Sequence, residues 1–188
     1  MLGGVPYSQR KSSHSALRTP TIPNASLVPA VVGALLQAGA QLFAVAVVVG
    51  TVTEAPPRSL AMYAGEYGYD SGPFWEAMPT VTLGLLLIAL VGNWRTPRRH
   101  LLLAAVGLFI AAGLFAVFVM GPAQEAVVGT GYSDAVDEAL RAQAAHWRML
   151  DWASWALTLS VGVVLAAALT VRVSDVRVPE ATADSHVA

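Results

Sequence analysis

Four long apolar stretches that contain no Lys, Arg, Asp or Glu dominate this chain. They cover residues 26–53, 77–93, 101–124 and 152–171. A helix of about 20 residues, rising about 1.5 Å per residue, crosses the roughly 30 Å hydrocarbon core of a bilayer. The stretches are continuous rather than alternating, which favours helices over barrel strands. The sequence therefore predicts an all-α fold, a four-helix transmembrane bundle whose main partner is the lipid bilayer.

Composition supports this class and excludes others. Hydrophobic residues make up 55% of the chain and charged residues 12%, and the mean hydropathy is +0.58, a combination that is rare in soluble domains. A net charge of −1 offers no basic surface for nucleic acid. The chain has no cysteine, so disulfides, thiolate nucleophiles, iron–sulfur clusters and zinc–cysteine sites are excluded.

One bundle uses nearly the whole chain. We expect a single transmembrane domain over residues 26–173 between two flexible cytoplasmic tails, residues 1–25 and 174–188. The predicted spans are about residues 28–52, 75–93, 100–121 and 147–172, with the third ending at Gly121-Pro122.

Basic residues predict the orientation. Eight of the eleven Lys and Arg residues precede the first span, lie between the second and third, or follow the fourth. The positive-inside rule then places both termini in the cytoplasm of a multi-pass protein of the cell membrane. Nine of the twelve acidic residues lie on the opposite side, between Glu54 and Asp151.

The fourth helix is predicted to start outside the membrane. Ser133 is a good N-cap, acidic residues follow it, and no proline interrupts residues 133–171. Such a helix would be roughly 60 Å long, so a bend near Ala144 is plausible. Aromatic residues gather at the same outer boundary, either as an interfacial belt or as the walls of an outward-facing pocket.

Polar residues inside apolar spans are costly and therefore informative. In the first span, Gln37 and Gln41 lie on one helical face with Gly33. They either hydrogen-bond to neighbouring helices or line a ligand cavity. In the second span, Glu76 follows Trp75 in the first turn, where it either caps the helix or exchanges protons.

The fourth span carries the longest polar stripe. Trp147, Asp151, Ser154 and Thr158 recur at helical spacing and should face the bundle interior. Arg148 lies on the adjoining flank. It either pairs with Asp151 at the interface or attracts an anion or enolate in a pocket. His146, next to this stripe, is a further candidate general base.

These patterns give a candidate site. The candidate catalytic residues are Glu76, His146 and Asp151, and the candidate substrate-binding residues are Gln37, Gln41, Trp75, Trp147, Arg148 and Ser154. No opposed histidine pair for haem, HExxH zinc motif, phosphate-binding glycine loop or GxSxG elbow occurs. We therefore expect no metal and no cofactor.

Two segments carry a family resemblance. The stretch WRTPRRHLLLAAVGLFIAAGLFAVFVMGPAQEAV, followed by RAQAAHWRMLDWASWALTLSVGVVLAAAL, resembles the anthrone oxygenase-like family of four-helix membrane proteins. The resemblance covers residues 27–172 in topology and residues 94–170 in motif. Trp147 fits the family tryptophan, whereas Asp151 stands where the family has His or Asn and Ser154 where it has Arg.

The resemblance implies a cofactor-independent oxygenase. Named members of the family oxidise polyketide anthrones to anthraquinones with molecular oxygen. Such a reaction needs a base that forms a substrate carbanion and an apolar pocket that admits oxygen, so the implied partners are oxygen and a small, apolar, enolisable aromatic substrate. The alternative is a noncatalytic bundle, a homo-oligomer or a small partner subunit, because the third span is rich in small residues that allow close helix contacts. Abundant alanine and valine suggest a bacterial source.

Overall fold

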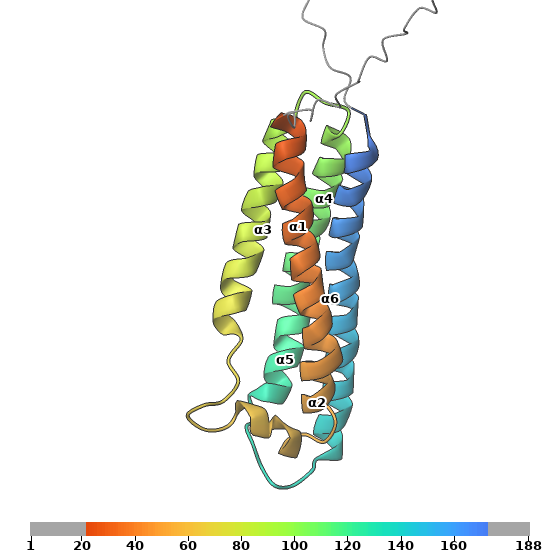
Figure 1. Cartoon of the computed structure of the whole chain (residues 1–188). Helices are drawn as coiled ribbons and strands as arrows, with labels where there is room; N and C mark the ends of the chain where they lie inside the picture. Colours follow the sequence, from red (N-terminus) through yellow and green to blue (C-terminus); the bar gives the residue numbers. More distant parts are fainter. Residues whose placement is uncertain (1–21, 173–188) are drawn as a thin grey trace, which may run out of the picture.

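The computed structural model describes residues 22–172, and this part of the chain is a helical bundle with one long axis (Figure 1). Its elements, in chain order, are α1 (Ile22–Phe43), the π-helix η1 (Ala44–Val49), α2 (Gly50–Val52), the 3-10 helix η2 (Arg58–Tyr63), α3 (Gly72–Gly92), α4 (Arg99–Phe115), the π-helix η3 (Ala116–Met120), α5 (Gly121–Val128) and α6 (Glu138–Thr170). The all-α prediction is confirmed.

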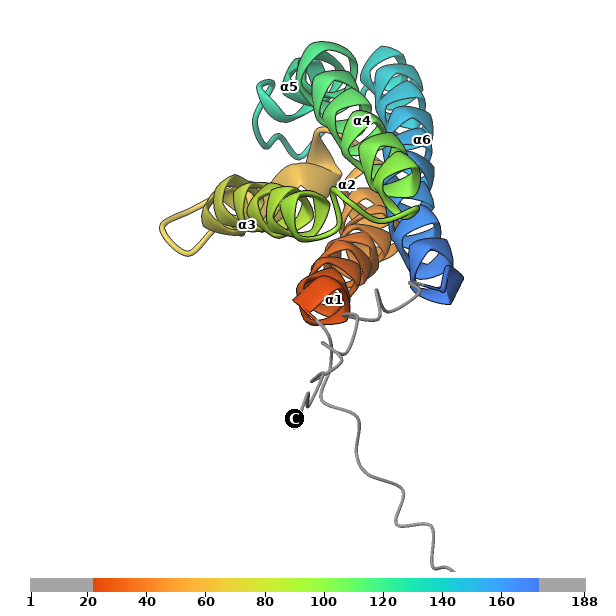
Figure 2. The ribbon, with the colours of Figure 1, turned by 90° about the horizontal axis from the view of Figure 1, so that it is seen from above.

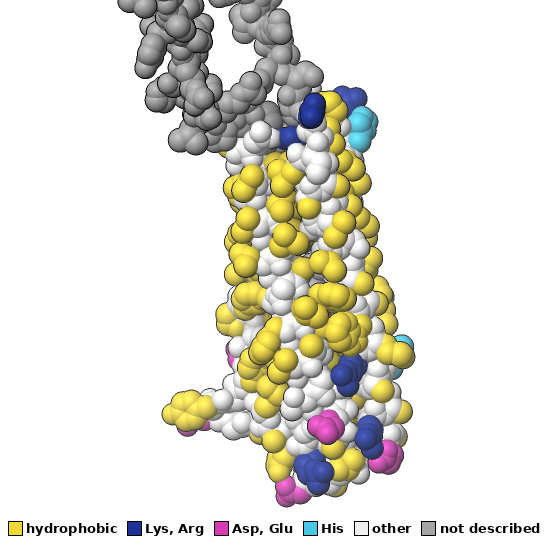
Figure 3. Space-filling view, turned by 45° about the vertical axis from the view of Figure 1, so that its right-hand side comes forward, with side chains coloured by type: hydrophobic (Ala, Val, Ile, Leu, Met, Phe, Trp, Pro, Cys, Tyr) yellow, Lys and Arg dark blue, Asp and Glu magenta, His cyan; other side chains and the backbone are white. Residues whose placement is uncertain are grey.

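Four continuous helical rods, α1–η1–α2, α3, α4–η3–α5 and α6, are long and apolar enough to cross a membrane within the described residues. Both described ends of the chain and the turn 93–98 lie at one end of the bundle, here called the proximal end (Figure 1). Residues 53–71 and 129–137 form the opposite, distal end. On the face shown in Figure 3, charged side chains gather at the two ends and apolar side chains cover the region between them.

Helix α6 is the central element of the packing. It contacts both α1 and α4, and α3 packs against the same two helices (Figure 2). Two glycines allow these close approaches. A Cβ at Gly162 would lie 2.7 Å from Leu35 Cδ2 across the α1–α6 contact, and one at Gly33 would lie 3.0 Å from Leu85 Cδ1 across the α1–α3 contact.

The apolar core consists of two separate clusters. The proximal cluster joins all four rods and includes Leu27, Leu86, Leu102 and Leu165. The distal cluster contains Val49, Val52, Leu60, Val127, Leu140, Ala144 and Trp147. Along α1 and α6, the segment between the two clusters carries the polar residues Gln37, Gln41, Asp151, Ser154 and Thr158.

Helix boundaries differ from the sequence prediction in three places. The first helix begins at Ile22 and passes through Pro29, so residues 22–25 are helical rather than part of a flexible tail. The predicted tails 1–21 and 174–188 lie outside the described residues. The third rod does not end at Gly121-Pro122 but continues to Val128. The π turn just before Pro122 changes the hydrogen-bonding register at the point where proline cannot donate.

The fourth helix starts later than predicted. Asp137, not Ser133, is the N-cap, and its Oδ1 accepts hydrogen bonds from the backbone N–H groups of Ala139 (2.8 Å) and Leu140 (3.1 Å). Ser133 instead accepts a bond from the Ala135 N–H within the loop. The loop is held by a bond from the Asp137 N–H to the Pro56 carbonyl (3.0 Å), which places the helix start at Glu138. The helix is then continuous through Ala144.

Arg98 links three rods at the proximal end. Its side chain is only 4% exposed. Its Nε donates to the Val171 carbonyl (2.9 Å), its Nη2 to the Leu169 carbonyl (3.4 Å), and its Nη1 to Asn24 Oδ1. The last carbonyls of a helix have no partner within the helix and favour a nearby cation. Arg98 therefore caps the end of α6 as well as adding to the basic charge counted in the sequence.

We expect Arg98→Met to lower the free energy of unfolding by about 2 kcal/mol, because the substitution leaves the last carbonyls of α6 without their charged donor. Unfolding in detergent, followed by circular dichroism, measures the loss. Arg99→Met is the matched control, since Arg99 is exposed and its substitution removes the same charge from the same end. Equal stability of the two variants would contradict a capping role for Arg98.

Candidate functional site

A cavity of about 670 Å³ lies between the two core clusters. Its volume falls in the range typical of small-molecule sites, about 300–1,000 Å³. It is lined by Gln37, Gln41, Ala44, Val48, Val49, Tyr63, Tyr69, Asp70, Ser71, Gly72, Trp75, Pro79, Phe109, Ala112, Gly113, Ala116, Val117, Met120, Gln124, Trp147, Asp151, Ser154 and Thr158. All four rods and the distal loop contribute to this wall.

The polar stripe of α6 faces this cavity, as the sequence predicted. Trp147, Asp151, Ser154 and Thr158 are buried and all four line the wall. Their spacing places them on one side of α6, and the bundle turns that side inward because lipid would leave their polar groups without partners. Thr158 Oγ1 also donates to the Ser154 carbonyl (3.1 Å), which satisfies its hydroxyl within the helix.

The glutamines of α1 meet this stripe. Gln41 Nε2 donates to Ser154 Oγ (2.9 Å), and the Gln41 side chain also lies close to the Asp151 carboxyl group. The sequence left two alternatives open for these glutamines, and Gln41 satisfies both, since it bonds a neighbouring helix and lines the cavity. Asp151 is 6% exposed.

Two buried polar atoms on cavity-lining side chains have no hydrogen-bond partner within residues 22–172. They are the acceptor Gln37 Oε1 and the donor Trp147 Nε1, on residues that are 7% and 2% exposed. An unsatisfied buried polar atom costs about 1–3 kcal/mol. A ligand whose acceptor and donor groups reached these two atoms would remove this cost, and the apolar remainder of the wall suits an aromatic framework.

Two π turns border the cavity. Ala44, Val48 and Val49 of η1 line one side, and Ala116, Val117 and Met120 of η3 line another. A π turn widens a helix by one residue, and such turns are frequent at functional sites. The sequence shows no local signal for either turn except Pro122, which follows η3 closely.

Aromatic side chains form the distal part of the wall. Trp75 lines the cavity, as expected of a substrate-binding residue, and contacts Phe74 edge to face at 4.9 Å between ring centroids. Tyr63 and Tyr69 also line it, with their centroids 6.0 Å apart. Trp152 and Trp155 pack on each other instead of on the cavity. The pocket-wall alternative therefore fits Trp75, Tyr63 and Tyr69, and the interfacial belt stays a prediction for the other aromatic residues.

Other predicted residues lie outside the cavity wall. Glu76 is exposed on α3 beside Trp75 but does not line the cavity. His146 is exposed and borders a separate surface hollow with residues of α5. Arg148 is exposed on the flank of α6 near Gly50 and forms no ion pair with Asp151; the ion pair of the described residues joins Arg141 and Glu138.

Burial changes the acidity of one distal residue. It raises the pKa of the Tyr63 hydroxyl above its ordinary value of 10.0, and the nearby Tyr69 and Asp151 raise this pKa further. The phenol therefore stays neutral at physiological pH and is a hydrogen-bond donor at the distal wall. Among residues 22–172, no group of His, Asp or Glu side chains is suited to hold a metal ion.

The fold and the cavity define the class of protein as a four-helix bundle of membrane-spanning length with an internal site. Residues that line this site supply one buried carboxyl group, that of Asp151, and two polar atoms without a partner among residues 22–172, Gln37 Oε1 and Trp147 Nε1. Comparison of the chain with known protein families, with curated proteins and with solved structures gives no match.

We expect the Tyr63 phenol to ionise at higher pH than an exposed tyrosine. Because the folded state keeps this proton above pH 10.0 while the unfolded state loses it, stability should fall as pH rises through that value. Tyrosinate absorbance and unfolding at alkaline pH measure the two effects. Tyr63→Phe should remove the late-titrating group and flatten the alkaline fall, and an unchanged titration in this variant would contradict the assignment.

Proposed function

We propose that this protein is a membrane oxygenase that acts without a cofactor on a small, apolar, enolisable aromatic ketone, in the manner of the anthrone oxygenases that its sequence resembles. The observation that carries the proposal is the buried Asp151 carboxyl group on the wall of a cavity of about 670 Å³. Gln41 lies beside this group, and the surrounding wall is mostly apolar.

In this proposal Asp151 is the general base. Its carboxylate removes a proton from the CH₂ carbon next to the ring system of the substrate, and the negative charge spreads onto the ketone oxygen. Trp147 Nε1 is a buried donor without a partner among residues 22–172 and would stabilise this oxygen. A positioned donor in a water-poor site stabilises developing charge strongly. Gln37 Oε1 would accept a bond from a hydroxyl group of the substrate.

The redox step needs only oxygen as co-reactant. The carbanion gives its electrons to O₂ and forms a carbon–oxygen bond, and the proton held by Asp151 returns to the terminal oxygen to give a hydroperoxide. Loss of water from the hydroperoxide turns the carbon into a second carbonyl. One atom of O₂ stays in the product and the other leaves as water, so the substrate carbon is oxidised and O₂ is reduced.

The test of the chemistry is anthrone oxidation by the purified protein in liposomes under oxygen, followed by quinone absorbance. We expect Asp151→Asn, which keeps the shape of the side chain, to lower the rate about 100-fold or more, as for loss of a general base. Glu76→Gln and His146→Gln are controls that should leave the rate unchanged, because neither residue lines the cavity. A rate for Asp151→Asn equal to that of the wild type would refute the role of Asp151.

A noncatalytic bundle or partner subunit is the second candidate function. Ala104, Gly107 and Ala111 form an exposed row of small residues on α4, while Ala105 and Ala112 pack inside the bundle. Such an exposed row suits contact with another membrane helix. A wild-type rate no higher than that of empty liposomes would favour this candidate.

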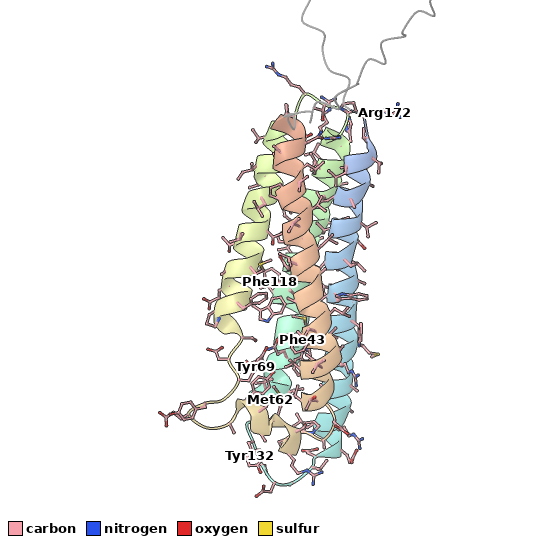
Figure 4. The ribbon with its side chains drawn as sticks, viewed as in Figure 1. Phe43, Met62, Tyr69, Phe118, Tyr132 and Arg172 are labelled. Atoms are coloured by element: carbon pink, nitrogen blue, oxygen red, sulfur yellow. The ribbon has the colours of Figure 1, made fainter. Side chains whose placement is uncertain are left out.

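We also propose that the proximal end faces the cytoplasm. Arg95, Arg98, Arg99 and Arg172 lie at that end, with Arg172 labelled in Figure 4, in agreement with the positive-inside rule. The chain has no native cysteine, so single cysteines report on one site each. In intact cells we expect a membrane-impermeant maleimide to label Tyr67→Cys in the distal loop and not Trp94→Cys in the proximal turn. The reverse pattern would overturn the orientation.

A further inference from the structure

The cavity has an open side between α3 and the third rod. Helix α3 packs against α1 and α4, whereas η3 and α5 pack against α6, and neither packs closely against α3 within the described residues. Figures 1 and 2 agree that the distal part of α3 leans away from the other rods. Trp75 and Pro79 line the cavity from α3, and Gly113 and Val117 line it from α4 and η3. The opening lies between these two pairs, and we call it the lateral opening.

Residues of η3 show that the opening reaches the outer surface of the bundle. Val117 lines the cavity and is 65% exposed. Phe118, the next residue, is also strongly exposed, and Figure 4 shows it at the level of the distal turns of α3. Gly113 is exposed, and a Cβ placed there would meet no atom within 4 Å. The edge of the opening is therefore apolar and contains free space.

The lateral opening lies at the depth of the hydrocarbon. At about 1.5 Å per residue, Gly113 lies about 21 Å along the rod from Arg99, and Pro79 lies about 20 Å along α3 from Gly92. Both values are smaller than the roughly 30 Å thickness of the hydrocarbon core. If the proximal ends of both helices lie at one membrane boundary, the opening faces lipid chains rather than water.

The distal loop crosses the other side of the cavity. The Tyr69 N–H donates to the Met62 carbonyl (2.7 Å), and the Tyr63 and Tyr69 rings are in contact. Figure 4 shows Met62 and Tyr69 close together toward the distal end, and Tyr69 lines the cavity. These contacts order residues 62–69 at the distal wall, where the exposed polar residues Asp70 and Gln124 also line the cavity. The edge of the lateral opening, in contrast, is apolar.

We propose that the cavity takes its ligand from the bilayer, through the lateral opening, and that the ligand is a neutral aromatic molecule dissolved in the lipid. This inference rests on the cavity used in the proposed function and specifies the source of its substrate. A neutral apolar molecule concentrates in the hydrocarbon phase, where the exposed valine and phenylalanine of η3 offer no polar barrier. A charged, water-soluble molecule would have to leave its hydration shell at this edge.

The route can be tested without any substrate, because the chain has no cysteine. Ala112→Cys places a thiol on the cavity wall. Ala105→Cys is the matched control, since it lies on the same face of α4 but is fully buried away from the cavity. Proteoliposomes are exposed to N-phenylmaleimide dissolved in the membrane, or to a sulfonated maleimide present in water on both sides. We expect N-phenylmaleimide to label Ala112→Cys and not Ala105→Cys, and the sulfonated reagent to label neither.

A second substitution tests the opening itself. Gly113→Phe, added to Ala112→Cys, should fill the free space and slow labelling by N-phenylmaleimide about tenfold, which corresponds to about 1.4 kcal/mol in the barrier to access. Gly107→Phe is the matched control, because Gly107 is also exposed and a Cβ added there would meet no atom within 4 Å, but it does not line the cavity. Circular dichroism verifies the fold of each variant, and Gly113→Leu serves if the phenylalanine variant is not folded.

Three results would overturn the proposal. The first is labelling of Ala112→Cys by the sulfonated reagent as fast as by N-phenylmaleimide. The second is a labelling rate that Gly113→Phe and Gly113→Leu leave unchanged, and the third is no labelling of Ala112→Cys by either reagent. The first would assign access to the aqueous side of the distal loop. None of these measurements depends on oxygen or anthrone. A protein without oxygenase activity can therefore still confirm lateral access, and an active protein can still refute it.

Discussion

Hydrocarbon offers no hydrogen-bond partners, and the placement of the polar side chains in this bundle follows from that constraint. Asp151, Ser154 and Thr158 would be costly against lipid, so α6 turns their side toward α1 and α4. Gln41 then meets Ser154 and Asp151 across the α1–α6 contact. Because polar groups occupy this level of the bundle, the apolar core divides into a proximal and a distal cluster with the cavity between them.

The two π turns and the tilt of α3 belong to the same arrangement. Both η1 and η3 lie at the level of the cavity, on rods that are regular α-helices where they contact the proximal cluster. Close packing at Gly33 and Gly162 holds α1 against α3 and α6 in the proximal half. Toward the distal end α3 leans away (Figure 2). The proximal half is thus the packed support, and the distal half provides the wall of the site.

The sequence located part of the site because helical periodicity is a local property. The spacing of Trp147, Asp151, Ser154 and Thr158 was sufficient to place them on one buried side. Neighbours of the stripe could not be assigned in this way. His146 and Arg148 flank Trp147 in sequence but are rotated by about 100° around the helix, and the structure leaves both exposed. The aromatic residues at the outer boundary, which include Tyr63 and Tyr69, indicated either an interfacial belt or a pocket wall, but a loop without periodicity does not reveal which of them line it.

The sequence by itself determined the four apolar rods, the concentration of arginine at one end and the inward polar stripe. Each of these depends on hydrophobicity and on 3.6-residue periodicity, which are written in consecutive residues. Only the tertiary structure decided the tilt of α3, the two π turns, the capping of α6 by Arg98 and the cavity with its lateral opening. These features arise from contacts between residues far apart in the chain, whose energies depend on how whole helices rotate and tilt against one another.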